Sequence, residues 1–190
     1  MHRRVGAAVV VLFLLLGPAR STTVERLPLE ALVERSETVA HGDCVAVRTE
    51  WDAGRTRIYT RVSIAPRELL KGGAGADRAL LELVLPGGEL DGMAYVIHGM
   101  PRARVGQELV VFATAAHPRS GVRLPCGLGQ GLWTVERAGR AAPAAVRDTR
   151  ELRLVERGVA GGEAGGVERA PLDDLLARIR AEAARQRGPR

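Results

Sequence analysis

Lysine is almost absent from this chain of 190 residues, although its formal net charge is +6. Lys71 is the only lysine, so arginine carries nearly all of the positive charge. Ala, Gly, Val, Leu and Arg are abundant along the whole chain, which is typical of a GC-rich coding sequence. The basic residues therefore do not indicate a selected patch for nucleic acid, for which basic residues clustered on one surface are expected.

Motifs typical of hydrolases are also missing. Zinc hydrolases are commonly marked by two histidines one helical turn apart with a glutamate between them, and serine hydrolases by a Gly-x-Ser-x-Gly elbow. The chain contains neither motif. We predict no catalytic residue, no cofactor and no metal, and leave enzymatic activity open. A metal-dependent hydrolase using convergent histidines (His41, His98 and His117) is the alternative.

The first 21 residues have the three parts of a cleavable secretory signal peptide. Arg3 and Arg4 provide a positive start, and residues 5–16 form an apolar run shorter than the roughly 20 residues needed to span a bilayer. The small residues Ala19 and Ser21 fit cleavage after Ser21. We predict an exported protein, periplasmic or extracellular, with no stable membrane anchor after cleavage.

Export changes the interpretation of charge and of cysteine content. Cleavage removes three arginines and leaves 25 basic and 22 acidic residues, a formal charge of +3. Because disulfides persist outside the cytoplasm, Cys44 and Cys126 are predicted to form one disulfide. It would close a loop of about 80 residues and stabilise the fold by roughly 4 kcal/mol. The alternative is two buried free cysteines that act as small apolar residues.

Short strands separated by turn residues dominate the body of the chain. The spacing of Leu29, Leu32 and Val33 after Pro28 first predicts one short helix over 28–36. Six strands are then predicted, over residues 38–51, 56–64, 81–85, 109–114, 121–126 and 132–136. Pro66 ends the second strand, and Gly42 indicates a bulge in the first. This pattern favours a mainly β domain, a small barrel or a sandwich.

A long segment from Gly87 to Gly106 is rich in glycine and has no firm periodicity. Loops of this length within a compact domain are usually functional or mobile, and loops on a rigid scaffold often carry binding residues. We therefore predict this segment as the contact surface. Its candidate binding residues are Glu89, Asp91, Tyr95, His98 and Arg102.

The last third of the chain is predicted to be a linker and a helix. Residues 139–170 are rich in Ala, Arg and Gly and are interpreted as a flexible linker. Residues 171–187 are predicted to form a helix, with acidic residues near its start and arginines toward its end. Its narrow apolar stripe consists of Leu172, Leu175, Leu176 and Ile179. This stripe is predicted to pack on the β domain, and a membrane-surface helix is the alternative.

Five short segments of this chain are Trp51–Thr60, Leu69–Gly72, Pro86–Gly88, Gly99–Pro101 and Gly106–Glu108. Together they resemble a set of uncharacterised exported bacterial proteins. The domain of those proteins is similar in fold to the tissue inhibitors of metalloproteinases, an oligonucleotide/oligosaccharide-binding (OB) barrel. The resemblance covers about residues 27–136 and departs at Ala103, where those proteins carry an aromatic residue. It implies an OB-like barrel. We therefore expect a domain over 24–138, a barrel of five to six strands with the short N-terminal helix, followed by the flexible linker and the C-terminal amphipathic helix.

The resemblance implies a fold rather than an activity. Metalloproteinase inhibitors place an N-terminal cysteine on the zinc of their target, and this chain has none near its predicted mature start. We expect a non-enzymatic binding module in the cell envelope or outside the cell, whose partner is a protein or glycan. No nucleic-acid partner is expected, since Tyr59 is the only aromatic beside Arg57 and Arg61. A structural module that docks through its terminal helix is a third interpretation.

Overall fold

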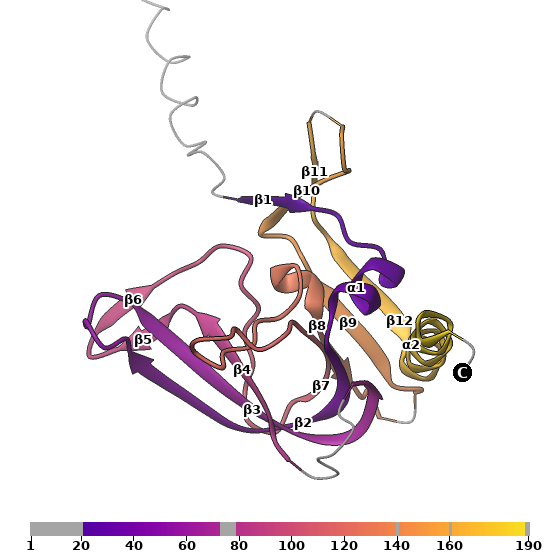
Figure 1. The fold of residues 1–190 in the computed structure, drawn as a ribbon, viewed down its shortest axis with the longest axis horizontal. Helices are drawn as coiled ribbons and strands as arrows, with labels where there is room; N and C mark the ends of the chain where they lie inside the picture. The colour runs from indigo at the N-terminus through magenta and orange to yellow at the C-terminus, as the bar shows by residue number, and fades with distance from the viewer. Residues whose placement is uncertain (1–20, 73–78, 140, 160, 189–190) are drawn as a thin grey trace, which may run out of the picture.

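The computed structural model describes residues 21–72, 79–139, 141–159 and 161–188. Nearly all of the predicted signal peptide therefore lies outside the described residues. The described chain is mainly β, with a short N-terminal helix, α1 (Leu29–Arg35), and a C-terminal helix, α2 (Leu172–Arg187) (Figure 1). Neither of these helices, nor any other in the described ranges, is long and apolar enough to cross a membrane.

One antiparallel sheet of seven strands, curled into a half-barrel, forms the body of the fold (Figure 1). Its strands follow in the spatial order β12-β9-β8-β7-β2-β3-β4. In chain order their bounds are β2 (Thr38–Trp51), β3 (Ile58–Lys71), β4 (Leu81–Pro86), β7 (Glu108–Ala113), β8 (Leu132–Glu136), β9 (Ala144–Asp148) and β12 (Val167–Pro171).

The two long strands β2 and β3 curl because their pairing is interrupted. The register shifts at three places along β2, one of them between His41 and Gly42, where the sequence predicts a bulge. A side chain at Gly42 would put its Cβ 2.3 Å from the Ala65 carbonyl oxygen, so glycine permits this close approach. Pro66 pairs with Gly42 at this irregularity, and β3 continues to Lys71 instead of ending at Pro66.

Residues 123–126 connect the two sides of the curled sheet. The amide of Val84 in β4 donates to the Arg123 carbonyl at 2.9 Å, and the amide of Cys126 donates to the Phe112 carbonyl of β7 at 2.8 Å. Ala113 and Pro125 form an isolated antiparallel bridge. The predicted strand over 121–126 is therefore reduced to one bridge, but it lies between β4 and β7.

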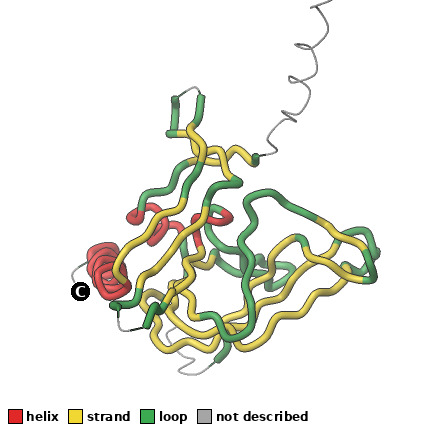
Figure 2. The backbone as a smooth tube through the Cα atoms, turned by 180° about the vertical axis from the view of Figure 1, so that it is seen from behind, coloured by secondary structure: helices red, strands yellow, loops and turns green. Residues whose placement is uncertain are grey.

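Alternate residues of the strands build two apolar cores on opposite faces of the sheet. In β7, Leu109 and Val111 belong to the core inside the curl, whereas Val110 and Phe112 belong to the core under the helices. The predicted apolar stripe of α2 is buried in that second core. Figures 1 and 2 show α2 at the end of the molecule opposite strands β5 and β6.

The prediction of a flexible linker over residues 139–170 is wrong. β9 pairs with both β8 and β12, so this stretch extends the main sheet by two strands. A third strand, β10 (Leu152–Val155), pairs in parallel with β1 (Thr22–Glu25) and antiparallel with β11 (Glu163–Ala164). Gly165 packs so closely that a Cβ would lie 1.9 Å from the Thr149 carbonyl oxygen. Glycine here serves close packing rather than flexibility.

The predicted disulfide is also wrong, because Cys44 and Cys126 are both buried free cysteines. Cys44 lies in the core inside the curl and Cys126 in the core under the helices, so the sheet separates them. Burial raises the pKa of both thiols, which keeps them neutral. The stated alternative, two small apolar cysteines, is what the structure contains.

Candidate functional site

The predicted contact segment folds into a hairpin followed by a loop over residues 96–106, which we call the return loop. Strands β5 (Gly88–Leu90) and β6 (Met93–Tyr95) pair antiparallel. The turn between them is formed by Asp91 and Gly92, both with positive φ, at 53° and 75°. Asp-Gly is a preferred pair for a two-residue hairpin turn of this kind. Sequence reasoning missed the hairpin, although this dipeptide was a signal that could have revealed it.

Asp91 fastens the hairpin to the turn between β2 and β3. Its carboxylate accepts a hydrogen bond from Trp51 Nε1 at 2.9 Å and a longer one from Arg55 at 3.4 Å. The Arg55 guanidinium also lies over the Trp51 ring, 5.6 Å from its centroid. Asp91 therefore has an anchoring role at the hairpin tip and lines neither of the hollows described below.

The base of the hairpin is fixed on β3 through two glycines. The Gly87 amide donates to the Ile58 carbonyl at 2.9 Å, and the Thr60 hydroxyl donates to the Gly87 carbonyl at 2.8 Å. At Gly88, which has a φ of 144°, an added Cβ would lie 2.6 Å from Thr60 Oγ1. The segment Pro86–Gly88 thus packs directly on the sheet, and the hairpin projects beside a hollow.

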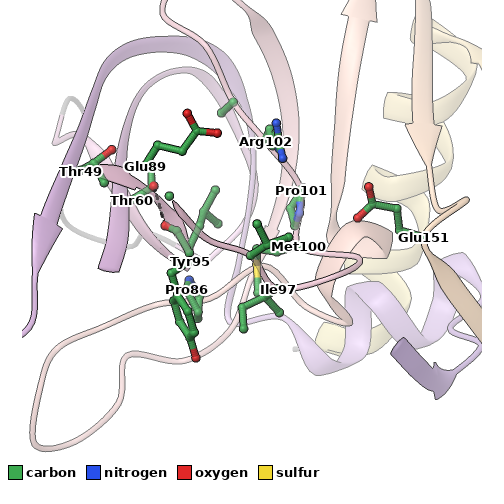
Figure 3. A pocket seen from close by; sticks show the side chains of 15 residues that line it. Thr49, Thr60, Pro86, Glu89, Tyr95, Ile97, Met100, Pro101, Arg102 and Glu151 are labelled. Atoms are coloured by element: carbon green, nitrogen blue, oxygen red, sulfur yellow. Dashed lines mark hydrogen bonds between the residues drawn. The ribbon is translucent and has the colours of Figure 1, made fainter. Parts of the chain in front are cut away.

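This hollow has a volume of about 260 Å³ and lies between the hairpin, the end of β4 and the return loop (Figure 3). The apolar side chains of its lining include those of Leu85, Ile97 and Met100. Its polar lining residues are Thr49, Thr60, Glu89, Tyr95, Arg102 and Glu151.

A second hollow, of about 430 Å³, adjoins the first. The two share four lining residues, three of them consecutive in the return loop: Met100, Pro101, Arg102 and Glu151. The second is otherwise lined by Gly99, Asp148 and Arg150. We call the two together the loop groove.

Hydrogen bonds hold the return loop against the body of the fold. The Gly99 amide donates to the Glu151 carboxylate at 3.0 Å, and the Gly99 carbonyl accepts from the Gly129 amide at 2.9 Å. The preceding carbonyl, of His98, accepts from the Thr22 hydroxyl at 2.6 Å. The wall of the groove is therefore fixed on both β1 and the segment after β9, as expected for a preformed site.

The structure brings three of the five predicted binding residues together. Glu89, Tyr95 and Arg102 line the loop groove, whereas Asp91 and His98 do not. Sequence reasoning missed Glu151, which lines both hollows and anchors Gly99. No signal in the chain could have found it, since Glu151 lies about 50 residues from the loop in what was interpreted as a linker.

Charges of both signs remain available at the groove. Within the described ranges, neither Glu89 nor Arg102 forms an ion pair, with each other or with a third residue. Arg150, in contrast, is held by Asp148 at 2.6 Å. That hydrogen bond also lowers the pKa of the Asp148 carboxyl, so the pair is internally neutralised.

The three histidines of the hydrolase alternative have separate surroundings. His41 Nε2 lies 2.7 Å from Glu108 Oε1, and His117 Nδ1 lies 3.2 Å from the Ser120 hydroxyl. His98 is in the return loop. Among the described residues, no group of three or more His, Cys, Asp or Glu side chains is arranged to hold a metal ion.

A buried ion cluster joins β2, β3 and β7 away from the groove. Glu108, 8% exposed, accepts two hydrogen bonds of 2.8 Å from Arg137 and a contact from His41, and Arg67 lies 3.2 Å away. Burial raises the pKa of Glu108, but the bonds from Arg137 and His41 outweigh it and leave the pKa below its usual value. The carboxylate is therefore charged and fully paired, which suits a structural role.

Comparison with known proteins adds no family to these observations. No protein-family model, curated protein or solved structure matches this chain. The function must therefore be inferred from the geometry and chemistry of the loop groove itself.

Proposed function

We propose that this chain is an exported, non-enzymatic binding module whose ligand site is the loop groove. One observation carries the proposal: a preformed hollow is lined by both apolar and polar side chains. Sites for small molecules and peptide segments commonly combine these features. The partner would be a protein or glycan in the cell envelope or outside the cell.

We further propose that the scaffold is an OB-like barrel. In support, β7, β2, β3 and β4 are neighbours in the sheet, and residues 123–126 bond to both β4 and β7. Five segments in this closed order correspond to the small five-stranded barrel of OB domains. β8, β9 and β12 would then extend the sheet beyond the barrel.

Export is supported by the sequence of residues 1–21 and by the position of β1. Thr22 is the first residue of β1, so cleavage after Ser21 would leave all of the strands and both helices in place. Intact-mass measurement of the exported protein tests this proposal, because it reports the new N-terminus directly. A mass that retains the first 21 residues would contradict cleavage.

Two exposed valines in the same segment allow a matched test of the groove. Val96 lines the groove and is 54% exposed, whereas Val105 is 64% exposed and lines neither hollow. We expect Val96→Trp to remove partners captured by crosslinking from envelope extracts, because the indole would occupy the hollow. Val105→Trp should retain them. Retention of every partner by both variants would show that the groove is not the contact site.

A further inference from the structure

We propose that the loop groove binds a short zwitterionic peptide with free ends. Arg102 would hold the terminal carboxylate and Glu89 the terminal ammonium group. The apolar lining residues would contact one side chain of the peptide. This inference rests on the proposed function, since it names the ligand class of the same groove.

Glu89 and Arg102 are two exposed side chains of opposite charge that have no ion-pair partner among the described residues. Glu89 comes from β5 and Arg102 from the return loop, and both line the same hollow without pairing (Figure 3). A groove lined by charges of one sign would select a simple anion or cation. A groove lined by charges of both signs suits a ligand that carries both a positive and a negative group. The planar guanidinium fork of arginine also matches a carboxylate in geometry.

The hollow also has apolar lining residues and a small size. Leu85, Ile97 and Met100 line it together with the charged Glu89 and Arg102. Burial of an apolar side chain there would supply affinity, and the flexible thioether of methionine adapts to different shapes. The volume of about 260 Å³ lies just below the roughly 300–1,000 Å³ range of small-ligand sites. A few residues would fit, rather than a folded domain.

Carboxylates on the groove argue against other ligand classes. Glu89 and Glu151 would repel a polyanion such as a nucleic acid. A neutral sugar would leave both Glu89 and Arg102 without charged partners. Tyr95 is the only aromatic side chain that lines the groove, so a stacking platform for sugars is limited to one ring.

The test uses four forms of the tripeptide Ala-Leu-Ala: unmodified, N-acetylated, C-amidated and blocked at both ends. Affinities would be measured by NMR titration of the signal-peptide-cleaved chain. We expect the unmodified form to bind most tightly and to shift the signals of groove residues such as Gly88 and Met100. Each block should weaken binding by about fivefold, as expected for loss of one charged contact at a partly exposed site.

Two variants assign the charges to their proposed partners. In Arg102→Gln, amidation should cause no further loss while acetylation still weakens binding, and Glu89→Gln should show the reverse pattern. Arg104→Gln and Glu34→Gln are matched controls, since both residues are exposed and line neither hollow. Unchanged melting temperatures would verify that the variants fold.

The outcomes separate this inference from the proposed function. Equal binding of all four peptides, or no binding of any, would overturn the ligand class. If the neutral disaccharide cellobiose instead shifted the groove signals, the groove would remain the site with a different ligand. If no probe shifted these signals and Val96→Trp retained every partner, the proposed function would fall as well.

Discussion

Replacing Gly99 with alanine tests how firmly the loop groove is held in place. Gly99 is buried and has a φ of 81°, and an added Cβ would lie 2.0 Å from Leu152 Cδ2. Leu152 is only 1% exposed, so its side chain has little room to move away. Two costs follow: a positive φ costs a non-glycine residue roughly 1–2 kcal/mol, and overpacking a core adds about 1–3 kcal/mol.

Gly92 provides the matched control for this variant. Its φ is 75°, and an added Cβ would meet nothing within 4 Å, so Gly92→Ala carries only the backbone cost. We expect Gly99→Ala to be less stable than Gly92→Ala by about 1–3 kcal/mol in urea unfolding. In a domain of this size each kcal/mol lowers the melting temperature by about 2–4 °C. Equal stabilities would refute the packing of Gly99 against Leu152.

Two further predictions concern buried groups. The folded pKa of Glu108 lies below its usual value of 4.5, so its stabilising contribution is complete above that value and is lost as pH falls through the folded pKa. Urea unfolding between pH 6 and pH 3 should therefore show a smaller loss of stability in Glu108→Gln than in the unchanged chain, and an identical loss would contradict the assignment. Both cysteines should be unreactive toward a thiol reagent in the folded protein and reactive after unfolding without reductant, because they are buried and free. An oxidised pair would lack any thiol signal after unfolding.

Much of the fold could be predicted from local patterns. Short apolar or alternating segments bounded by turn residues located β2, β4, β7 and β8 closely, and helical spacing with a preceding proline located α1 and α2. These elements each bury several large side chains, which makes their periodicity visible in the sequence.

The missed strands have weaker patterns. β9 has the sequence Ala-Ala-Val-Arg-Asp and buries only Ala145, so no apolar alternation marks it. β12 has no buried residue at all. β12 pairs with β9, and β9 pairs with β8, and a local pattern does not show these long-range interactions.

The candidate site was found only in part for a related reason. The glycine-rich segment contains Glu89, Tyr95 and Arg102, which line the same hollow. Glu151 lies in residues 139–170, which were interpreted as a linker, so its position at the groove could not be inferred. The cysteine pairing failed because the sequence did not reveal that Cys44 and Cys126 lie in different cores.

The central claim, that the loop groove is the ligand site, is tested most directly by crosslinking in living cells. A photoreactive amino acid would replace Val96 on the groove or Val105 outside it. Both positions are exposed, so the substitutions should leave the fold intact. We predict a crosslinked partner from position 96 and none from position 105. Equal crosslinking from both positions, or a partner captured from position 105 alone, would contradict the assignment of this site.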